Sequence, residues 1–296
     1  MIHVCMAVRL CAQRAGTEEP VTRDQASGRE QVVLDEAFRN YARLLRIYVD
    51  SRGMVNYPGL VRDRELHNEA AADLGSLGQR TFAGLSGKGQ LALLINAYNL
   101  CAIDVVVTNW PVRRNWLTGW FYPGGSIRQI GGAFDEISHQ LLGGRFTLEE
   151  IGHNLIRERY GDPRVHLALV CASRGCPPLR GAPYTADSLD FQLDDQVRRF
   201  LSEPANFQID RNKARVYLSE IFDRYADDWL AAGYTHLDSL SPPNRGSEQL
   251  GAPVRAVLEF IAGYVDREQR GYLEAGGYEV EFTDYDWSLN VQEDAR

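Results

Sequence analysis

The sequence predicts a mostly helical α+β fold, a single domain with a small and largely antiparallel sheet. Apolar residues recur at helical spacing over several segments, whereas strand-like stretches are few and short. The chain has 296 residues, 44% of them hydrophobic, which is enough to bury one large core. We expect this domain over residues 31–292. Residues 1–30 are expected to be a disordered segment or a degenerate export signal, because His3 and Arg9 break their apolar start.

Helices are expected in the first part of the chain. Apolar residues recur at helical spacing across residues 33–49, and a second amphipathic helix is expected across residues 63–74. A glycine turn and a short extended piece, residues 51–60, separate the two. The N-terminal part of the domain is therefore expected to consist of two helices joined by this extended piece.

Residues 90–109 form the most apolar segment, which is long enough to span a bilayer. Asn96, Asn99 and Asp104 lie within it, and polar groups at these positions favour the buried core helix of a globular domain. Pro111 ends this helix. We therefore expect no membrane span.

The middle of the chain is expected to hold a loop, a capped helix and a strand. Residues 113–136 are rich in Gly and Trp, which indicates a long loop with short strands. Thr147 and Glu150 predict the capping box of a helix that Gly161 ends. Residues 164–170 are apolar and are expected to form a buried strand.

The last third of the chain is expected to add helices, a hairpin, and a late strand that pairs with a strand distant from it in sequence. The pattern predicts helices over residues 186–203, 220–233 and 254–265, a hairpin over residues 207–219, and an extended segment over residues 278–290. A polar loop is expected over residues 236–253.

Charge and cysteine content limit the partners. The formal net charge is −8, the pI is about 5.3, and the arginines are scattered along the chain. Nucleic acids and anionic membrane surfaces require a concentrated basic face, so neither is expected as a partner. The expected substrate is a small molecule or a peptide. The five cysteines are an odd, sparse set of thiols, and the cytoplasm is favoured over the periplasm or secretion.

Four segments in order resemble a known family. They are LLINAYNLCAIDVV, DPRVHLALVCASRGCPPL, LDFQLDDQVRRFL and YDWSLN. Together they resemble the family called domain of unknown function 547, over the chain from about Leu44 to Asn290. The family's name assigns no activity, so the resemblance implies a fold boundary and a candidate site but no reaction. Members often have Glu where this chain has Gly152, before His153.

Cys176 is the candidate nucleophile. It follows the expected strand and a Ser-Arg-Gly turn, and Pro177 and Pro178 restrict the backbone beside it. Arg174 and Arg180 flank the thiol, and two cations there would bind its thiolate and lower its pKa. A thiol held in this way attacks a substrate when a histidine lies near it. The alternative is a small side chain buried in the core.

Two histidines are candidates for the general base. His166 begins the expected strand and is favoured over His153, which lies on the capped helix nearly opposite its apolar face. Asp286 is expected to orient the imidazole. Asn96 and Asn99 share one helical face and are expected to orient a histidine, donate to an oxyanion, or tie a neighbouring loop to the core.

Three functions are consistent with these residues. The first is a thiol-dependent hydrolase or acyltransferase that acts on an amide, ester or thioester, with Cys176 as nucleophile and His166 as base. The second is a non-catalytic binding or interaction domain. The third is a zinc or redox site built from Cys171, Cys176 and His166. Cys171 is otherwise expected to pack in the core, and no cofactor besides that zinc ion is expected, because phosphate-binding glycine loops are missing.

Overall fold

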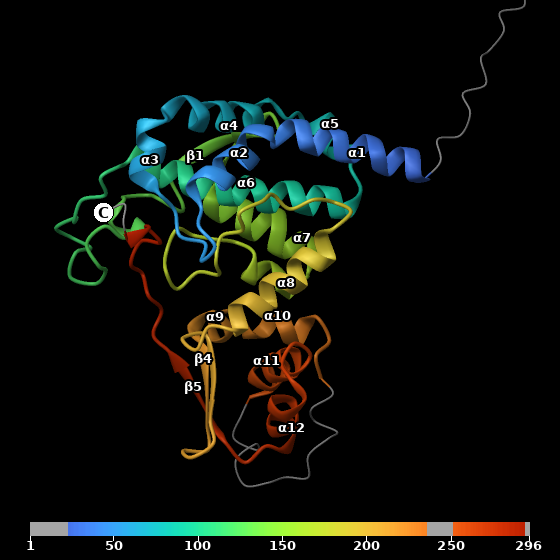
Figure 1. Ribbon diagram of the computed structural model, residues 1–296, viewed down its shortest axis with the longest axis vertical. Coiled ribbons are helices and arrows are strands. Elements are labelled where there is room, and N and C mark those ends of the chain that lie inside the picture. The colour runs from blue at the N-terminus through green and yellow to red at the C-terminus, as the bar shows by residue number, and fades with distance from the viewer. Residues whose placement is uncertain (1–22, 236–250, 294–296) are drawn as a thin grey trace, which may run out of the picture.

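The computed structural model describes residues 23–235 and 251–293 (Figure 1). Residues 1–22, most of the segment expected to be disordered or an export signal, lie outside the described residues, and so does most of the loop expected over residues 236–253. The first described helix, α1 (Arg23–Ala37), starts before residue 31. The helical part of the chain therefore begins earlier than the sequence predicts.

Helices account for 52% of the structure, and the strands form two small sheets of two and three strands, which confirms the mostly helical α+β fold. The helices that follow α1 include two 3₁₀ segments, η1 and η3, and one π-helical segment, η2. In chain order they are α2 (Arg39–Tyr48), α3 (Tyr57–Arg62), α4 (Arg64–Ser76), α5 (Gln79–Ala83), α6 (Gly87–Thr108), η1 (Ile127–Gln129), η2 (Glu150–Arg157), α7 (Glu158–Tyr160), η3 (Pro163–Leu167), α8 (Leu189–Leu201), α9 (Glu220–Arg224), α10 (Ala226–Ala231), α11 (Ala252–Ala262) and α12 (Arg267–Ala275).

Two of the three strand pairings are antiparallel. Strands β1 (Ser138–Leu141) and β2 (Gly144–Thr147) form one hairpin, and β3 (Phe207–Asp210) and β4 (Arg215–Ser219) form the expected second one. Strand β5 (Glu279–Thr283) pairs in parallel with β4, after α9 to α12 have intervened. The late, non-local strand expected from the sequence is therefore present.

Three local expectations are wrong. Residues 164–170 do not form a strand: Pro163 and the side chain of Asp162, which accepts a hydrogen bond from Arg164 N, start the 3₁₀ turn η3 instead. The apolar residues are buried as expected, but an apolar run of this length does not distinguish a strand from a helical turn. Residues 113–136 contain η1 and no strand. The helix expected over residues 220–233 is divided into α9 and α10 at Tyr225.

Helix α6 is the centre of the larger core. It is long and apolar enough to cross a membrane, but 89% of its most hydrophobic window is buried inside the protein, as expected of a core helix. Helices α1, α3 and α4 pack against it, and the Thr147–Glu150 capping box opens the helical turns of η2 against it. A second apolar cluster surrounds the fully buried Trp229 of α10, with side chains from α8, α9, α11 and β4.

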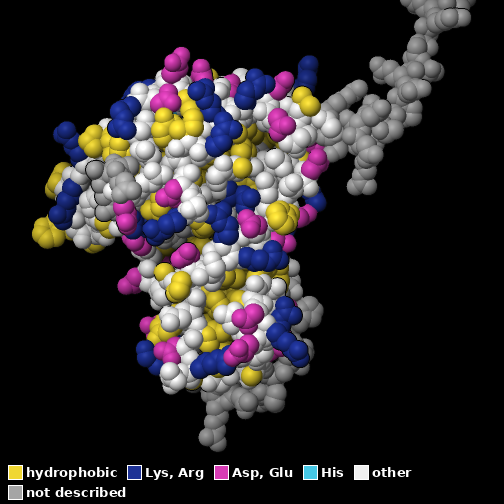
Figure 2. Space-filling view, in the orientation of Figure 1, with side chains coloured by type: hydrophobic (Ala, Val, Ile, Leu, Met, Phe, Trp, Pro, Cys, Tyr) yellow, Lys and Arg dark blue, Asp and Glu magenta, His cyan; other side chains and the backbone are white. Residues whose placement is uncertain are grey.

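The C-terminal segment joins these two regions. Figure 1 shows it running from β5, beside α11 and α12, back to the helices at the N-terminal end of the domain. There, Val55 N donates to Asn290 O over 2.8 Å, and Asn290 N donates to Ala172 O over 3.1 Å. On the face shown in Figure 2, the basic and acidic side chains of the described residues are interspersed, which agrees with the scattered arginines of the sequence.

Asn96 ties a loop to α6, the structural role that the sequence left open. Its Nδ2 donates to Tyr184 O over 2.9 Å, and its Oδ1 accepts from Tyr184 N over 2.8 Å. Both groups of Tyr184 are buried with the Asn96 side chain, which is 1% exposed. The Asn96 amide therefore satisfies both backbone polar groups of Tyr184 away from water.

We predict that Asn96→Ala lowers the free energy of unfolding by about 3 kcal/mol, because a buried N–H and C=O lose their partners. Urea unfolding measures this change, with the exposed Asn212→Ala as the control that leaves stability within about 0.5 kcal/mol. Equal stability of the two variants would contradict the role assigned to Asn96.

Candidate functional site

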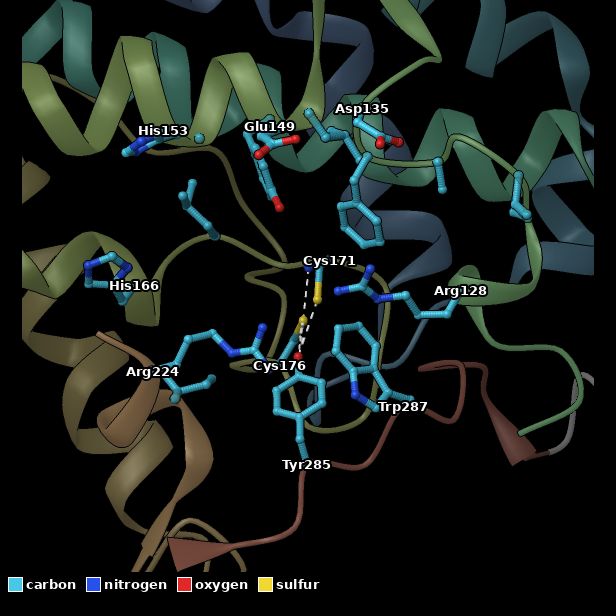
Figure 3. A pocket seen from close by; sticks show the side chains of 18 of the residues that line it. Arg128, Asp135, Glu149, His153, His166, Cys171, Cys176, Arg224, Tyr285 and Trp287 are labelled. Carbon is cyan, nitrogen blue, oxygen red and sulfur yellow. Dashed lines mark hydrogen bonds between the residues drawn. The ribbon is translucent and has the colours of Figure 1, made fainter. Parts of the chain in front are cut away.

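A cavity of about 760 Å³ lies where the middle and C-terminal segments of the chain meet (Figure 3). Its walls come from α6, the loop before β1, η2, the segment after η3, α9 and the C-terminal segment. The side chains labelled in Figure 3 include Arg128, Cys171, Cys176, Tyr285 and Trp287, and the two sulfurs lie at its centre. The cavity therefore brings together side chains from segments that are far apart in the sequence.

Two free cysteines share one hydrogen-bond network in this cavity. The Tyr285 hydroxyl lies 3.0 Å from Cys176 Sγ and 3.2 Å from Cys171 Sγ. The Ser173 hydroxyl lies 3.2 Å from Cys176 Sγ and 3.4 Å from Cys171 Sγ, and 2.7 Å from the Tyr285 oxygen. Cys171 N donates to Cys176 Sγ over 2.9 Å. We call these two residues the Cys171–Cys176 pair.

Asn99 of α6 fixes the backbone that leads to the pair. Its Nδ2 donates to Ala168 O over 3.0 Å, and its Oδ1 accepts from Val170 N over 2.8 Å. Ala172, which follows Cys171, has a left-handed φ of 61°, a conformation uncommon for residues other than glycine. The Asn290 N–H bond to Ala172 O holds this turn. The reversal brings Cys171 and Ser173 to the same hydroxyl group of Tyr285.

Gly175 allows the C-terminal segment to reach the sulfurs. A Cβ atom at this position would lie 2.9 Å from Asp286 N and 3.0 Å from the Tyr285 ring. Gly175 N donates to Asp286 O and Arg174 N donates to Ser288 O, each over 2.8 Å. The absence of a side chain at Gly175 therefore lets Tyr285 approach the pair closely.

The two sulfurs differ in their environment. Cys176 is 7% exposed, whereas Cys171 is half-buried and faces the cavity. Hydrogen bonds from the Cys176 thiol, Ser173 and Tyr285 outweigh burial and lower the pKa of Cys171 to about 6. Burial, and then the neighbouring Cys171, raise the pKa of Cys176. The pair therefore favours one thiolate, on Cys171, beside one thiol.

His166 lines the cavity but does not contact the sulfurs in the described structure. Its Nε2 lies 2.6 Å from Asp228 Oδ2, and its ring stacks on Tyr225 with centroids 3.9 Å apart. Arg157 holds the same carboxylate through two hydrogen bonds of 2.6 and 2.8 Å. Burial lowers the pKa of His166, against the opposing influence of Asp228. The predicted contact between His166 and Cys176 is therefore wrong, because η3 turns the imidazole toward α10.

The other predicted site residues lie in different places. His153 is at the cavity wall and pairs with Glu158 at 3.6 Å. Asp286 is exposed and its carboxylate accepts from Ser288 N, so it orients no imidazole. The arginines expected at the thiolate are engaged elsewhere: Arg174 pairs with Glu293 at 3.6 Å and Arg180 with Asp195 at 2.5 Å.

Several residues that line the cavity or contact its walls are not among the site residues predicted from the sequence. Ser173 lies between the two cysteines, and Tyr285 begins the C-terminal motif, so proximity to recognised segments could have indicated both. Arg128 lies in a loop with no regular pattern, and Asp228 lies in an ordinary acidic helix. Gly152 lines the cavity, and a Cβ there would lie 3.1 Å from Tyr98 Cε2. The glycine therefore leaves room that a glutamate at this position would fill.

Among the described residues, no group of three or more His, Cys, Asp or Glu side chains has a geometry that could hold a metal ion. The zinc alternative required His166 together with both sulfurs, and the Nε2 atom of His166 faces Asp228 instead. Within the described part of the chain, the residues proposed as zinc ligands do not converge on one point.

We predict that Asn99→Ala speeds amide hydrogen exchange over residues 168–172 by about tenfold or more, because it releases the backbone before Cys171. Exchange read by mass spectrometry tests this, with Asn96→Ala as the matched control that speeds exchange around Tyr184 instead. Identical exchange patterns in the two variants would show that neither asparagine holds a particular segment.

The family model described as Protein of unknown function, DUF547 matches residues 82–201. This range includes α6, η2, η3, the Cys171–Cys176 pair and α8, whereas Tyr285 and Trp287 lie beyond it. No curated protein and no solved structure matches the chain. The family resemblance is confirmed over residues 82–201, the part of the chain that the family model matches.

Proposed function

We propose that this protein is a thiol-dependent acyl-transfer enzyme, a hydrolase or acyltransferase, whose reactive group is the Cys171–Cys176 pair. The observation that carries the proposal is the arrangement of two free thiols around the Tyr285 and Ser173 hydroxyl groups in a cavity of about 760 Å³. Hydroxyl donors stabilise a thiolate, and a thiolate is the nucleophilic form of cysteine.

Cys171 is the attacking residue in this proposal. The sequence favoured Cys176, but Cys171 has the more accessible side chain and a pKa lowered to about 6. A sulfur already ionised near neutral pH does not require a histidine to remove its proton. The engagement of His166 with Asp228 is therefore compatible with catalysis by the pair.

Cys176 supplies the proton to the leaving group. The Cys171 thiolate forms a bond to the carbonyl carbon, and the carbonyl electron pair moves to oxygen. When these two electrons re-form the carbonyl double bond, the bond to the leaving group breaks, and the leaving group takes the proton of the Cys176 thiol. Water, or an acceptor nucleophile, then attacks the acyl-cysteine and returns one proton to Cys176. The enzyme regains one thiolate and one thiol.

The electrostatics of the pair favour this order of proton transfers. Cys171 is one of the groups that raise the pKa of Cys176, after burial. Acylation removes the charge of Cys171, so the Cys176 thiol becomes more acidic when the leaving group needs a proton. Proton donation is thereby coupled to acylation.

A dithiol–disulfide couple is the second candidate. It is favoured by the same Tyr285 oxygen lying within 3.2 Å of both sulfurs. Oxidation would join Cys171 and Cys176 in a disulfide, while a disulfide-containing substrate would take up the two electrons and the proton of Cys176 and leave as one thiol and one thiolate. Acylation of Cys171 and disulfide formation with a substrate are separate reactions, so mass spectrometry distinguishes them.

We predict that Cys171 is alkylated by iodoacetamide at a rate that rises through pH of about 6, because the rate follows the thiolate and hydrogen bonds lower the pKa of Cys171. Tyr285→Phe removes one donor and is expected to move this profile toward the ordinary thiol pKa of about 8.5. Peptide mass spectrometry measures the rate at each cysteine, with the buried Cys101 as the internal control. A wild-type midpoint at the ordinary thiol value would contradict a stabilised thiolate.

We predict that p-nitrophenyl acetate places one acetyl group on Cys171 and none on Cys101. Cys171→Ser is expected to abolish this labelling. Cys176→Ser is expected to change this labelling little, because p-nitrophenolate leaves without a proton. With an unactivated ethyl ester, whose ethoxide needs a proton to leave, the same variant is expected to slow acylation of Cys171 by about 10²-fold, because a general acid is lost. Failure of the wild type to form an acyl-cysteine would favour a binding domain, and a Cys171–Cys176 disulfide formed with a disulfide substrate would favour the redox candidate.

A further inference from the structure

Arg128 is the cavity's free cation. The cavity is also lined by Arg157 and Arg224, but each of these pairs with a carboxylate, Asp228 and Glu220 respectively, at 2.6 Å. No ion pair joins Arg128 to a carboxylate in residues 23–235 and 251–293, and its buried Nε has no hydrogen-bond partner there. Its charge is therefore available for a ligand.

Aromatic rings hold this guanidinium in place. Its central carbon lies 4.4 Å from the centroid of the Trp287 ring, 4.8 Å from that of Phe134 and 5.7 Å from that of Tyr122. Aromatic faces attract a guanidinium but accept no conventional hydrogen bond, so its N–H groups retain their donor capacity. The side chain is oriented without being neutralised.

The guanidinium points toward the Cys171–Cys176 pair. Figure 3 shows the Arg128 side chain extending along the Trp287 ring toward the sulfur of Cys171. Asp135 and Glu149 also line the cavity, but both are exposed. An anionic group bound by Arg128 would therefore lie beside the reactive sulfur.

We propose that Arg128 binds a carboxylate of the substrate, so that the enzyme acts on acyl compounds that carry a second, anionic carboxylate group near the reacting carbonyl. This inference rests on the proposed function of the pair. A guanidinium presents parallel N–H groups that match the two oxygens of a carboxylate. Arg128 is thus a specificity-determining residue, and the charged group of the substrate sets the position of its carbonyl relative to Cys171.

A pair of alkylating reagents tests the inference. Iodoacetate and iodoacetamide react with the same thiolate, but the first carries a carboxylate and the second a neutral amide. A change in the pKa of Cys171 alters both rates equally, so it does not alter their ratio. We expect wild-type Cys171 to react with iodoacetate at least as fast as with iodoacetamide at pH 7. Arg128→Gln is expected to lower this rate ratio about tenfold, because it removes the local positive charge.

Two further variants keep the result interpretable. Arg113→Gln removes a positive charge from an exposed site of the same loop that does not line the cavity, and is expected to leave the ratio within about twofold. Arg128→Lys keeps the positive charge but loses the parallel N–H groups of the guanidinium, and is expected to retain part of the preference for iodoacetate. Thermal melting of each variant shows whether it is folded.

The outcomes separate the two proposals. Alkylation of Cys171 by both reagents with the same ratio in wild type and Arg128→Gln would overturn the carboxylate inference and leave the proposed function standing. Failure of both reagents to alkylate wild-type Cys171 would overturn both. Protection of wild-type Cys171 from iodoacetamide by malonate supports a carboxylate ligand, whereas protection by inorganic phosphate alone would overturn that assignment.

Discussion

The candidate site depends on the buried side-chain amide of Asn99, which forms hydrogen bonds to the backbone of the segment before Cys171. Asn99 lies in the most apolar helix of the chain, and its side chain satisfies a carbonyl and an N–H of the segment before Cys171. An unsatisfied amide at such a position would destabilise the fold, so the same interaction that stabilises α6 also determines where Cys171 lies. Asn96 makes the equivalent pair of bonds one turn earlier, to Tyr184. One face of α6 thus fixes the segments on both sides of the cysteine loop.

The second constraint comes from the C-terminal segment, which is distant in sequence. Tyr285 is separated from Cys176 by 109 residues and from Cys171 by 114, yet its hydroxyl contacts both sulfurs. The parallel β4–β5 pairing and the backbone bonds to residues 172–175 determine its position from two sides. The C-terminal segment therefore supplies one of the hydrogen-bond donors that lower the pKa of Cys171. The matched family range ends at residue 201, so this donor comes from a part of the chain outside that range.

Much of the fold follows from the sequence because its cause is local. The periodicity of α4, α6 and α8, the capping box at Thr147 and the β3–β4 hairpin each depend on residues close to one another in sequence. The 3₁₀ turn η3 is less evident, since its apolar residues fit a strand equally well and only Asp162 and Pro163 distinguish the two. Among the site residues, the sequence identified both cysteines, His166 and the two asparagines, but it did not predict their relationships. The contacts of Tyr285 and Arg128 depend on tertiary packing, which short-range patterns do not encode.

The separation of His166 from the sulfurs has a consequence for how the thiolate is stabilised. A cysteine paired with an imidazole becomes ionised by transferring its proton to that base, and the resulting charges stabilise each other. The Cys171–Cys176 pair instead concentrates donors around the sulfur of Cys171: a second thiol, two hydroxyl groups and the backbone of Ser173. Such a site keeps its negative charge local and leaves the guanidinium of Arg128 as the neighbouring cation without a carboxylate partner in the described structure. Because hydrogen-bond donors rather than an imidazole lower the pKa of Cys171, His166 is free to serve a structural role, stacking on Tyr225 and joining η3 to α10 through Asp228.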